Sequence, residues 1–258
     1  MFKKIIFHTL GLKAYLKVLH KSFHFMYAAG GLKNNVIYKY HYFDKNMIQP
    51  GDVVLDIGGN LGYYTKLFAK WVGPTGHVYA VEPVVDFANV IKWATKGINN
   101  VTIYNVALGE EEKDITLSTP GKFGYLRTGL AHVTRPDEQQ EVHEFTFQAK
   151  MKQGSKLFAN LPKIDFIKCD IEGYEEYVLS EMKVVLLKHK PVLQLETYGE
   201  QKARLEALLT GMGYEIYDIE DNKLKPLAEM KNPILGDFFY IHKDNKGVIE
   251  RLKKNGRA

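Results

Sequence analysis

Short apolar runs alternate with helical patterns along most of the chain. The runs with the length and composition of buried strands are residues 53–57, 77–82, 101–107, 164–170 and 192–197. The helical patterns that follow four of them are residues 62–72, 84–96, 175–189 and 200–211. Strands and helices that alternate through short links form right-handed crossovers and a parallel sheet with helices on both faces. The sequence therefore predicts an α/β fold.

Two stretches break this alternation. Residues 109–163 contain two strand-like pieces, Asp114–Ser118 and Val142–Gln148, around a turn-rich stretch, which indicates an inserted hairpin or lid. The chain then ends with two strand patterns, Tyr214–Ile219 and Phe238–His242, without a helical pattern between them. We expect these last two strands to pair in antiparallel fashion at the edge of the sheet.

The first residues form a basic arm. Residues 3–28 predict an amphipathic helix with Lys13, Lys17, Lys21 and His24 on one face and apolar side chains on the other. Three interpretations remain open: a helix packed over the main domain, a helix that joins two copies as a homodimer, and a basic helix resting on an anionic membrane. We divide the chain into this arm and its lead-in (1–50), a catalytic domain (51–243) and a basic tail (244–258).

Charge and composition narrow the class of protein. The formal net charge is +5, but residues 1–43 hold seven lysines and no acidic residue, so the rest of the chain is close to neutral. A nucleic-acid partner is therefore not implied. The single cysteine excludes an internal disulfide framework, and no apolar run approaches the roughly 20 residues that cross a bilayer. We expect a cytoplasmic protein, either free or held at the inner face of a membrane by residues 3–28.

The turn after the first strand indicates a nucleotide-like cofactor. It contains Asp56, Gly58, Gly59, Asn60 and Gly62. A dinucleotide fingerprint needs Gly-x-Gly-x-x-Gly, and two of its three glycines are missing at this spacing. The acid within the strand has no role in binding a pyrophosphate, but it suits a positively charged ligand. S-adenosylmethionine carries a sulfonium and an α-amine, so the pattern favours this cofactor.

The next two strand ends add contacts for an adenosine group. Glu82 ends the second strand, where a carboxylate can accept hydrogen bonds from both ribose hydroxyls. The same acid would serve NAD, so it does not choose between the two cofactors. At the end of the third strand, Asn105 could bond the adenine edge and the small Ala107 could leave room for the ring.

Acidic residues also follow the fourth and fifth strands. Asp170, Glu172 and Glu196 would meet Asp56 and Glu82 at the carboxyl edge of the sheet, where ligands of open parallel sheets bind. For Glu175 and Glu176 we favour a different role, complementing the start of the next helix.

A protein that used this cofactor to methylate a hydroxyl would have to align the acceptor and remove its proton. The candidate bases are Asp170, Glu172, Glu196 and His132, the last within the insertion. Alternatively, Mg²⁺ or Mn²⁺ held by Asp170 and Glu196 would lower the pKa of the hydroxyl, although the sequence shows no compact ligand cluster. The default mechanism is proximity, with Asp170 or Glu172 orienting the acceptor.

Three blocks of the sequence resemble the FkbM-type methyltransferases, a branch of the class I S-adenosylmethionine-dependent enzymes. They are residues 55–65, residues 78–83 with 105–109, and residues 164–175, of which the last, with Lys168-x-Asp170-x-Glu172-Gly173-x-Glu175, is the most specific. The resemblance implies a Rossmann-like, seven-stranded sheet and O-methylation of a sugar, glycan or natural product. It also implies that Asp56, Gly58, Asn60 and Gly62 hold the methionine end of the cofactor and that Glu82 holds the ribose. Residues 149–152 depart from the family pattern.

Two other functions compete with this hypothesis. The first is an NAD(P)-dependent oxidoreductase built on a similar sheet. The second is a non-catalytic module that binds at a membrane surface and retains only a remnant of the site. The complete set of Asp56, Glu82 and Asp170 speaks against a decayed site.

Overall fold

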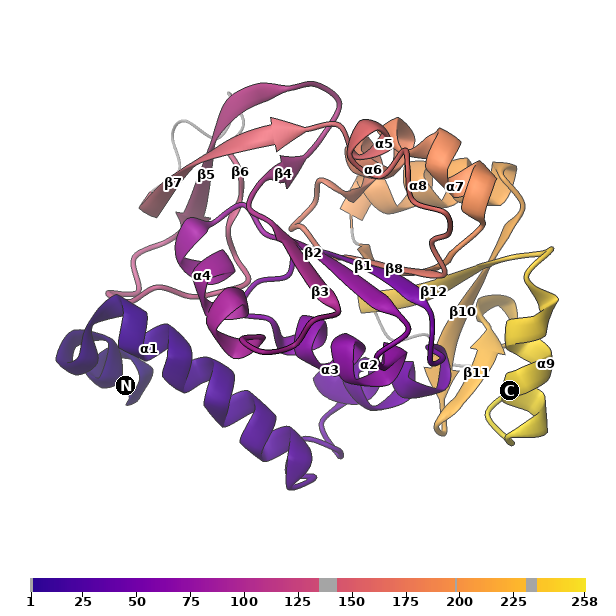
Figure 1. The fold of residues 1–258 in the computed structure, drawn as a ribbon, viewed down its shortest axis with the longest axis horizontal. Coiled ribbons are helices and arrows are strands. Elements are labelled where there is room, and N and C mark those ends of the chain that lie inside the picture. The colour runs from indigo at the N-terminus through magenta and orange to yellow at the C-terminus, as the bar shows by residue number, and fades with distance from the viewer. Residues whose placement is uncertain (1, 135–142, 198, 231–235) are drawn as a thin grey trace.

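Helices cover both faces of one large mixed sheet, and a smaller sheet stands beside it (Figure 1). The computed structural model describes residues 2–134, 143–197, 199–230 and 236–258. The large sheet has eight strands in the order β11-β10-β12-β9-β8-β1-β2-β3. Their bounds are Val53–Ile57 (β1), His77–Val81 (β2), Val101–Tyr104 (β3), Phe166–Cys169 (β8), Val192–Thr197 (β9), Tyr214–Glu220 (β10), Lys223–Pro226 (β11) and Gly236–His242 (β12).

The five strands β3-β2-β1-β8-β9 pair in parallel, as the strand-helix alternation predicts. β12 pairs antiparallel with both β9 and β10, which confirms the expected antiparallel region at the C-terminal end. The register sets Lys168 of β8 between Asp56 of β1 and Gln194 of β9. The carboxyl ends of the parallel strands therefore meet at one edge, and this edge carries the acidic residues.

The sheet has one strand more than the seven that the family resemblance implies. β11 turns back from β10 through Asp221 and Asn222, which both adopt left-handed conformations with φ of 53° and 59°. Asp and Asn tolerate this region better than most residues, so they can close a tight hairpin. The prediction missed β11 because its four residues, Lys223–Pro226, alternate lysine with leucine and proline and form no apolar run.

The predicted strand 101–107 is wrong as one element. β3 ends at Tyr104, and Ala107–Leu108 (β4) joins the smaller sheet instead. This sheet has the order β4-β7-β5-β6, with Lys113–Pro120 (β5), His132–Val133 (β6) and His143–Lys152 (β7). It contains the two strand-like pieces of the insertion, paired antiparallel. Val142, the first residue of the second predicted piece, lies outside the described residues.

The helices follow the predicted pattern with two differences. The predicted helix 175–189 divides at Met182, and the predicted arm helix contains a non-helical Gly11 with φ of 70°. In the part of the chain that the structure describes, no helix combines the length and the apolar character needed to cross a membrane. The α-helices are Phe2–Ala28 (α1), Lys39–Phe43 (α2), Tyr63–Val72 (α3), Val85–Ala94 (α4), Gly154–Leu157 (α5), Glu175–Glu181 (α6), Lys183–His189 (α7), Gly199–Gly211 (α8) and Lys246–Lys254 (α9). The 3₁₀ helices are Val36–Tyr38 (η1), Asp44–Asn46 (η2) and Leu227–Glu229 (η4).

Alternate residues of the central strands enter two different cores. Leu55 and Ile57 of β1 pack with α6, α7 and α8 on one face, whereas Val54 packs with α2, α3 and α9 on the other. Because successive side chains of a strand point to opposite faces, a strand covered on both sides is apolar almost throughout. This explains the continuous apolar runs of the sequence.

α1 packs against the domain. Its Tyr15 and Leu16 are buried with Leu61 of the glycine turn and Leu126 of the insertion. The hydroxyl of Tyr15 donates to the carbonyl oxygen of Leu126 at 3.1 Å, and Nδ1 of His20 lies 2.7 Å from the carbonyl oxygen of Leu61. α1 therefore supports both the glycine turn and the loop that faces it.

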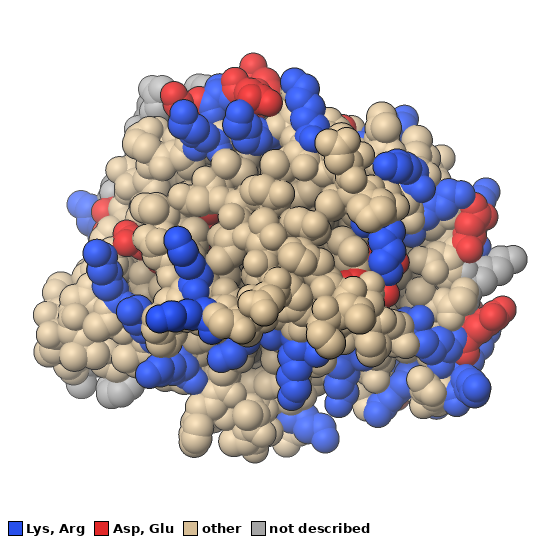
Figure 2. Space-filling view, viewed as in Figure 1, with Lys and Arg blue, Asp and Glu red and all other residues tan. Residues whose placement is uncertain are grey.

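The lysines of α1 have partners within the chain as well. The ammonium groups of Lys17 and Lys21 lie 5.1 and 5.5 Å from the ring centre of Trp93 on α4. Figure 2 shows lysine and arginine side chains spread over this face, separated by uncharged surface. Contacts of this kind stabilise a helix on its own domain.

Replacing Leu16 by alanine should test whether α1 belongs to the core. Leu16 is 0% exposed, and removal of a buried leucine typically costs about 2–5 kcal/mol. The matched control is Leu10→Ala in the same helix, where Leu10 is 52% exposed and the change should stay within about 0.5 kcal/mol. Urea unfolding measures both variants, and equal effects would show that α1 contributes no core packing.

Candidate functional site

The turn between β1 and α3 packs directly against the end of β8. Gly58 adopts a left-handed conformation with φ of 82°, and a Cβ atom there would lie 1.9 Å from the carbonyl oxygen of Asp170. Asn60 and Gly62 are also left-handed, with φ of 48° and 76°. Glycine is therefore required at position 58 both by its own φ and by the neighbouring backbone.

The amide groups of this turn point into the protein. The N–H groups of Gly58 and Gly59 both donate to the carbonyl oxygen of Val81 at 3.0 Å. The N–H of Asn60 donates to Oε2 of Glu82 at 2.7 Å. A turn that binds a pyrophosphate presents its N–H groups to the ligand. These three amides have internal partners, which supports the choice against a dinucleotide.

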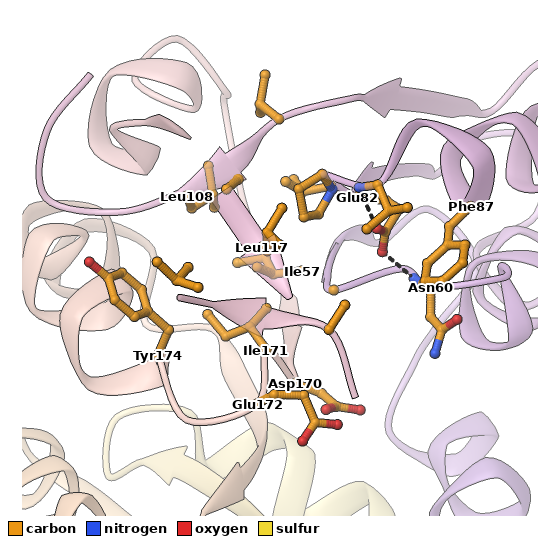
Figure 3. Close-up of a pocket in the computed structure, with 18 of the residues that line it drawn as sticks. Ile57, Asn60, Glu82, Phe87, Leu108, Leu117, Asp170, Ile171, Glu172 and Tyr174 are labelled. Atoms are coloured by element: carbon orange, nitrogen blue, oxygen red, sulfur yellow. Dashed lines mark hydrogen bonds between the residues drawn. The ribbon is translucent and has the colours of Figure 1, made fainter. Parts of the chain in front are cut away.

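Glu82 joins the glycine turn to the end of β2. Its second oxygen, Oε1, accepts from the N–H of Val84 at 2.8 Å, so each carboxylate oxygen already holds one backbone amide (Figure 3). Burial raises the pKa of Glu82 to about 8, against these hydrogen bonds. A carboxylate oxygen can accept more than one hydrogen bond, so Glu82 retains capacity for a ligand hydroxyl.

A cavity lies between the carboxyl edge of the large sheet and the smaller sheet. Figure 3 shows Asp170 and Glu172 together at one end of it, away from Leu108 and Leu117. Most of its lining is apolar, which suits a flat ring system. The lining residues are Ile57, Gly58, Asn60, Val81, Glu82, Pro83, Val84, Phe87, Val106, Ala107, Leu108, Leu117, Gly129, Ala131, Val133, Asp170, Ile171, Glu172 and Tyr174.

Asp56 does not line this cavity. Its side chain is fully buried beneath the turn, where it accepts a hydrogen bond from the hydroxyl of Thr65. Burial raises its pKa, and the positive charge of Lys168 on the neighbouring strand opposes that rise. The sequence-based expectation placed this acid against the cofactor, whereas the structure places it against a buried lysine of the protein itself.

The end of β8 brings three carboxylates together. Asp170, Glu172 and Glu196 each offer an oxygen within 4.8 Å of the other two. Nζ of Lys168, which is buried, lies 2.8 Å from Oδ2 of Asp170. Glu172 adopts a left-handed φ of 55°, a conformation that a glutamate rarely takes outside functional turns.

The three carboxylates differ in their protonation. Burial would raise the pKa of Asp170, but the charge of Lys168 and a hydrogen bond from Glu196 outweigh it, and the pKa is lowered. Burial and the charge of Asp170 raise the pKa of Glu172 to about 8 and that of Glu196 to about 9. At neutral pH an ionised Asp170 therefore sits beside a protonated Glu196 that donates to it.

Other predicted site residues take supporting positions. The Asn105 amide donates to the carbonyl oxygens of Glu82 and Pro83 at 2.8 and 2.9 Å, so it ties the end of β3 to the end of β2. Ala107 lines the cavity, as the prediction requires for room beside the ring. Gly59 packs against Ile91 of α4, and Gly62 is the residue that precedes α3. Both glycines therefore shape the turn through their backbone.

His132 lies away from the cavity. Its neighbours Ala131 and Val133 line the cavity, and alternation along the strand directs His132 to the opposite side. Nδ1 of His132 lies 3.2 Å from the carbonyl oxygen of Leu130. The structure therefore does not bring this candidate base to the carboxylates. Glu175 holds the turn before α6, where its Oε1 accepts from the N–H of Ile171 at 2.8 Å.

Among the described residues, the cluster of Asp170, Glu172 and Glu196 is the place where a divalent cation could bind. Its all-oxygen donors suit Mg²⁺ or Mn²⁺. The sequence placed Asp170, Glu172 and Glu196 at one edge of the sheet, but it showed no compact ligand cluster, because the distances between two strand ends are set only in the fold. However, the ammonium of Lys168 already neutralises part of its charge.

Sequence reasoning missed two parts of the site. The sequence analysis assigns no role of its own to Lys168, although a lysine inside the apolar strand Phe166–Cys169 signals a buried partner of opposite charge. The cavity wall formed by Leu117, Gly129, Ala131 and Val133 has no signal in the sequence that we can identify, because it depends on how the smaller sheet folds over the larger one.

Gly58→Ala should separate the close backbone contact from the cost of the φ angle. Gly73→Ala is the matched control, because Gly73 has φ of 65° and nothing lies within 4 Å of an added Cβ. We expect a loss on the order of 1 kcal/mol for Gly73→Ala and a clearly larger loss for Gly58→Ala. Denaturant unfolding measures both, and equal losses would contradict the contact with Asp170.

The pKa of Glu196 predicts how stability depends on pH. The ordinary pKa of this group is 4.5, whereas in the fold it is about 9. Between these values the folded chain keeps a proton that the unfolded chain has released, so the free energy of unfolding falls as pH rises. Glu196→Gln should flatten this fall between about pH 5 and 9, unlike Glu250→Gln on the exposed surface of α9. Urea unfolding across this range measures it, and slopes equal to those of the unmodified protein would refute the assignment.

Comparisons with known proteins show which proteins the chain is similar to. A crystal structure of the methyltransferase FkbM from Methylobacillus flagellatus has a TM-score of 0.51 and 16% identity, covering 79% of this chain and 47% of that one. A protein-L-isoaspartate O-methyltransferase from Ignicoccus hospitalis is 40% identical over 58 residues, 22% of this chain. The ubiquinone/menaquinone biosynthesis C-methyltransferase UbiE from Hydrogenovibrio crunogenus is 50% identical over 110 residues, 41% of this chain.

The length of each match determines whether it shows a shared family or only a shared segment. The chain spans 28% of the first curated relative and 41% of the second, so each shares only a part with it. The methyltransferase FkbM domain model, by contrast, matches residues 56–216, which is more than half of the chain. The resemblance seen in the sequence is confirmed, and the protein belongs to the FkbM methyltransferase family.

Proposed function

We propose that the protein transfers a methyl group from S-adenosylmethionine to a hydroxyl oxygen of a sugar, glycan or natural product. The observation that carries this proposal is the composition of one cavity. Its middle is lined by apolar side chains, one end has Glu82 after β2, and the other end has the carboxylates of Asp170 and Glu172 after β8.

The residues present fit this cofactor. The apolar lining suits the adenine ring, and Glu82 has free lone pairs for ribose hydroxyls. Oδ1 of Asn60 is buried and has no hydrogen-bond partner among the described residues, so it can accept from the ammonium of the methionine part. Asp170, which stays ionised, supplies negative charge for a cationic ligand at the other end, where Glu172 also lines the cavity.

Bound S-adenosylmethionine would supply an electrophilic methyl group at this end. Asp170 stays ionised because of Lys168, so it can hold an acceptor hydroxyl in place by accepting its hydrogen bond. Glu172 and Glu196, with raised pKa values of about 8 and 9, keep their protons at neutral pH, so they can donate hydrogen bonds to an acceptor but do not take its proton. Asp170, the ionised member of the cluster, is the residue to which we assign removal of the hydroxyl proton.

Oxygen is the favoured target because carboxylates can orient and deprotonate a hydroxyl. The names of the partial relatives include both an O-methyltransferase and a C-methyltransferase, so those names alone do not choose the atom. The inward-pointing amides of Gly58, Gly59 and Asn60 favour this reading over an oxidoreductase that binds a dinucleotide.

Calorimetric titration with S-adenosylhomocysteine and with NADH tests the cofactor. We expect S-adenosylhomocysteine to bind and NADH not to bind. Glu82→Gln should weaken the binding by about tenfold or more, because an amide leaves one oxygen where Glu82 has two, and these oxygens accept from the N–H groups of Asn60 and Val84 as well as from ribose hydroxyls. Glu110→Gln on the surface is the control. Binding of NADH but not of S-adenosylhomocysteine would overturn the proposal.

A further inference from the structure

A second hollow lies on the other side of Asp170. Asp170 is the one residue that it shares with the cofactor cavity, and its lining also includes Glu196 from the same cluster of three carboxylates. Its lining residues are Val36, Ile37, Lys39, Tyr40, His41, Tyr64, Asp170, Glu196, Gly236 and Asp237. A group held in this hollow would therefore meet the contents of the first cavity at the carboxylates.

The wall of the hollow comes from the N-terminal lead-in, residues 36–41, and is firmly held. The hydroxyl of Tyr40 donates to Oδ1 of Asp218 at 2.5 Å and contacts the carbonyl oxygen of Asp237. Nζ of Lys39 lies 2.6 Å from the same Asp218 oxygen. This wall lies outside the matched residues 56–216, so it is a feature of this chain beyond the family core.

Aromatic rings and unpaired acceptors give the hollow its chemistry. The His41 ring stacks on Tyr64 with centroids 3.8 Å apart and an angle of 24°. His41 is 8% exposed, and its Nδ1 is buried with no hydrogen-bond partner in the part of the chain that the structure describes. Burial lowers the pKa of His41 to about 3, so the imidazole is neutral and can donate or accept.

The charges of the hollow favour one kind of ligand. Asp170, Glu196 and Asp237 contribute carboxyl groups, whereas the ammonium of Lys39 is engaged by Asp218. Several hydrogen-bond acceptors beside aromatic rings suit a ring that carries many hydroxyl groups. A phosphate or carboxylate on that ring would meet like charge close to Asp170 and Asp237.

We propose that this second hollow is the acceptor site, and that it takes uncharged or cationic polyhydroxylated rings and rejects anionic ones. The proposal rests on the proposed methyl transfer and adds the substrate class to it. Residues 36–41 and Asp237 then determine specificity, while Asp170 and Glu196 face the hydroxyl that is methylated.

Blocking the hollow tests its role. Cys169, the single native cysteine, is buried. In the variant Ile37→Cys, a bulky maleimide will therefore react with the introduced cysteine and not with Cys169. The matched control is Val184→Cys on α7, because Ile37 is 72% exposed and Val184 is 73% exposed. We expect the label at 37 to reduce methyl transfer more than about tenfold with S-adenosylhomocysteine affinity unchanged, and the label at 184 to change neither.

The acceptors are methyl glycosides of neutral hexoses and of amino sugars, each compared with the matching uronate and sugar phosphate. Neutral and amino members should be preferred by about tenfold or more in kcat/KM. Asp237→Asn, which keeps an oxygen to accept from Gln194, should narrow that preference.

The outcomes separate the two proposals. If the protein binds S-adenosylhomocysteine but transfers no methyl group to any member of the set, the acceptor site is refuted, whereas the proposed function fails only if S-adenosylhomocysteine does not bind. If transfer occurs but the label at 37 leaves it intact, or anionic members are preferred, the acceptor site alone is refuted.

Discussion

The site depends on the interaction between the buried ammonium of Lys168 and the acidic side chains around it. Removing an ammonium from water costs several kcal/mol unless opposite charges surround it, and here Asp170, Asp56 and Asp237 do so. The ring of Tyr64 adds a contact at 4.7 Å from Nζ. One cation therefore fixes acids from three strands, β1, the end of β8 and β12, in a single buried network.

This cation also makes neighbouring carboxyl groups chemically different. Asp170 bonds it directly and stays ionised, whereas Glu172 and Glu196 lie near the negative charge of Asp170 and hold their protons to higher pH. Groups of the same type with separated pKa values can divide the tasks of orienting and deprotonating a substrate. Asp170, at the centre of this division, lines both the cofactor cavity and the second hollow.

Close packing sets the remaining geometry. Gly58 brings the turn after β1 against the carbonyl of Asp170. The glycine turn and the end of β8 are therefore in direct contact. Glu82 then holds the turn through Asn60, and α1 supports it through Leu61. The amphipathic pattern of α1 predicted a helix with one buried face, but it did not say which surface buries that face.

The sequence by itself determined the parallel sheet, the glycine turn and the acidic strand ends, because strand alternation and turn chemistry are local properties. It also favoured S-adenosylmethionine over a dinucleotide through the missing glycines. Only the tertiary structure decided that Asp56 faces Lys168, that His132 points away from the cavity and that Glu196 shares a proton with Asp170. These depend on register between strands and on how the smaller sheet folds over the larger, and both are set by contacts between residues far apart in the chain.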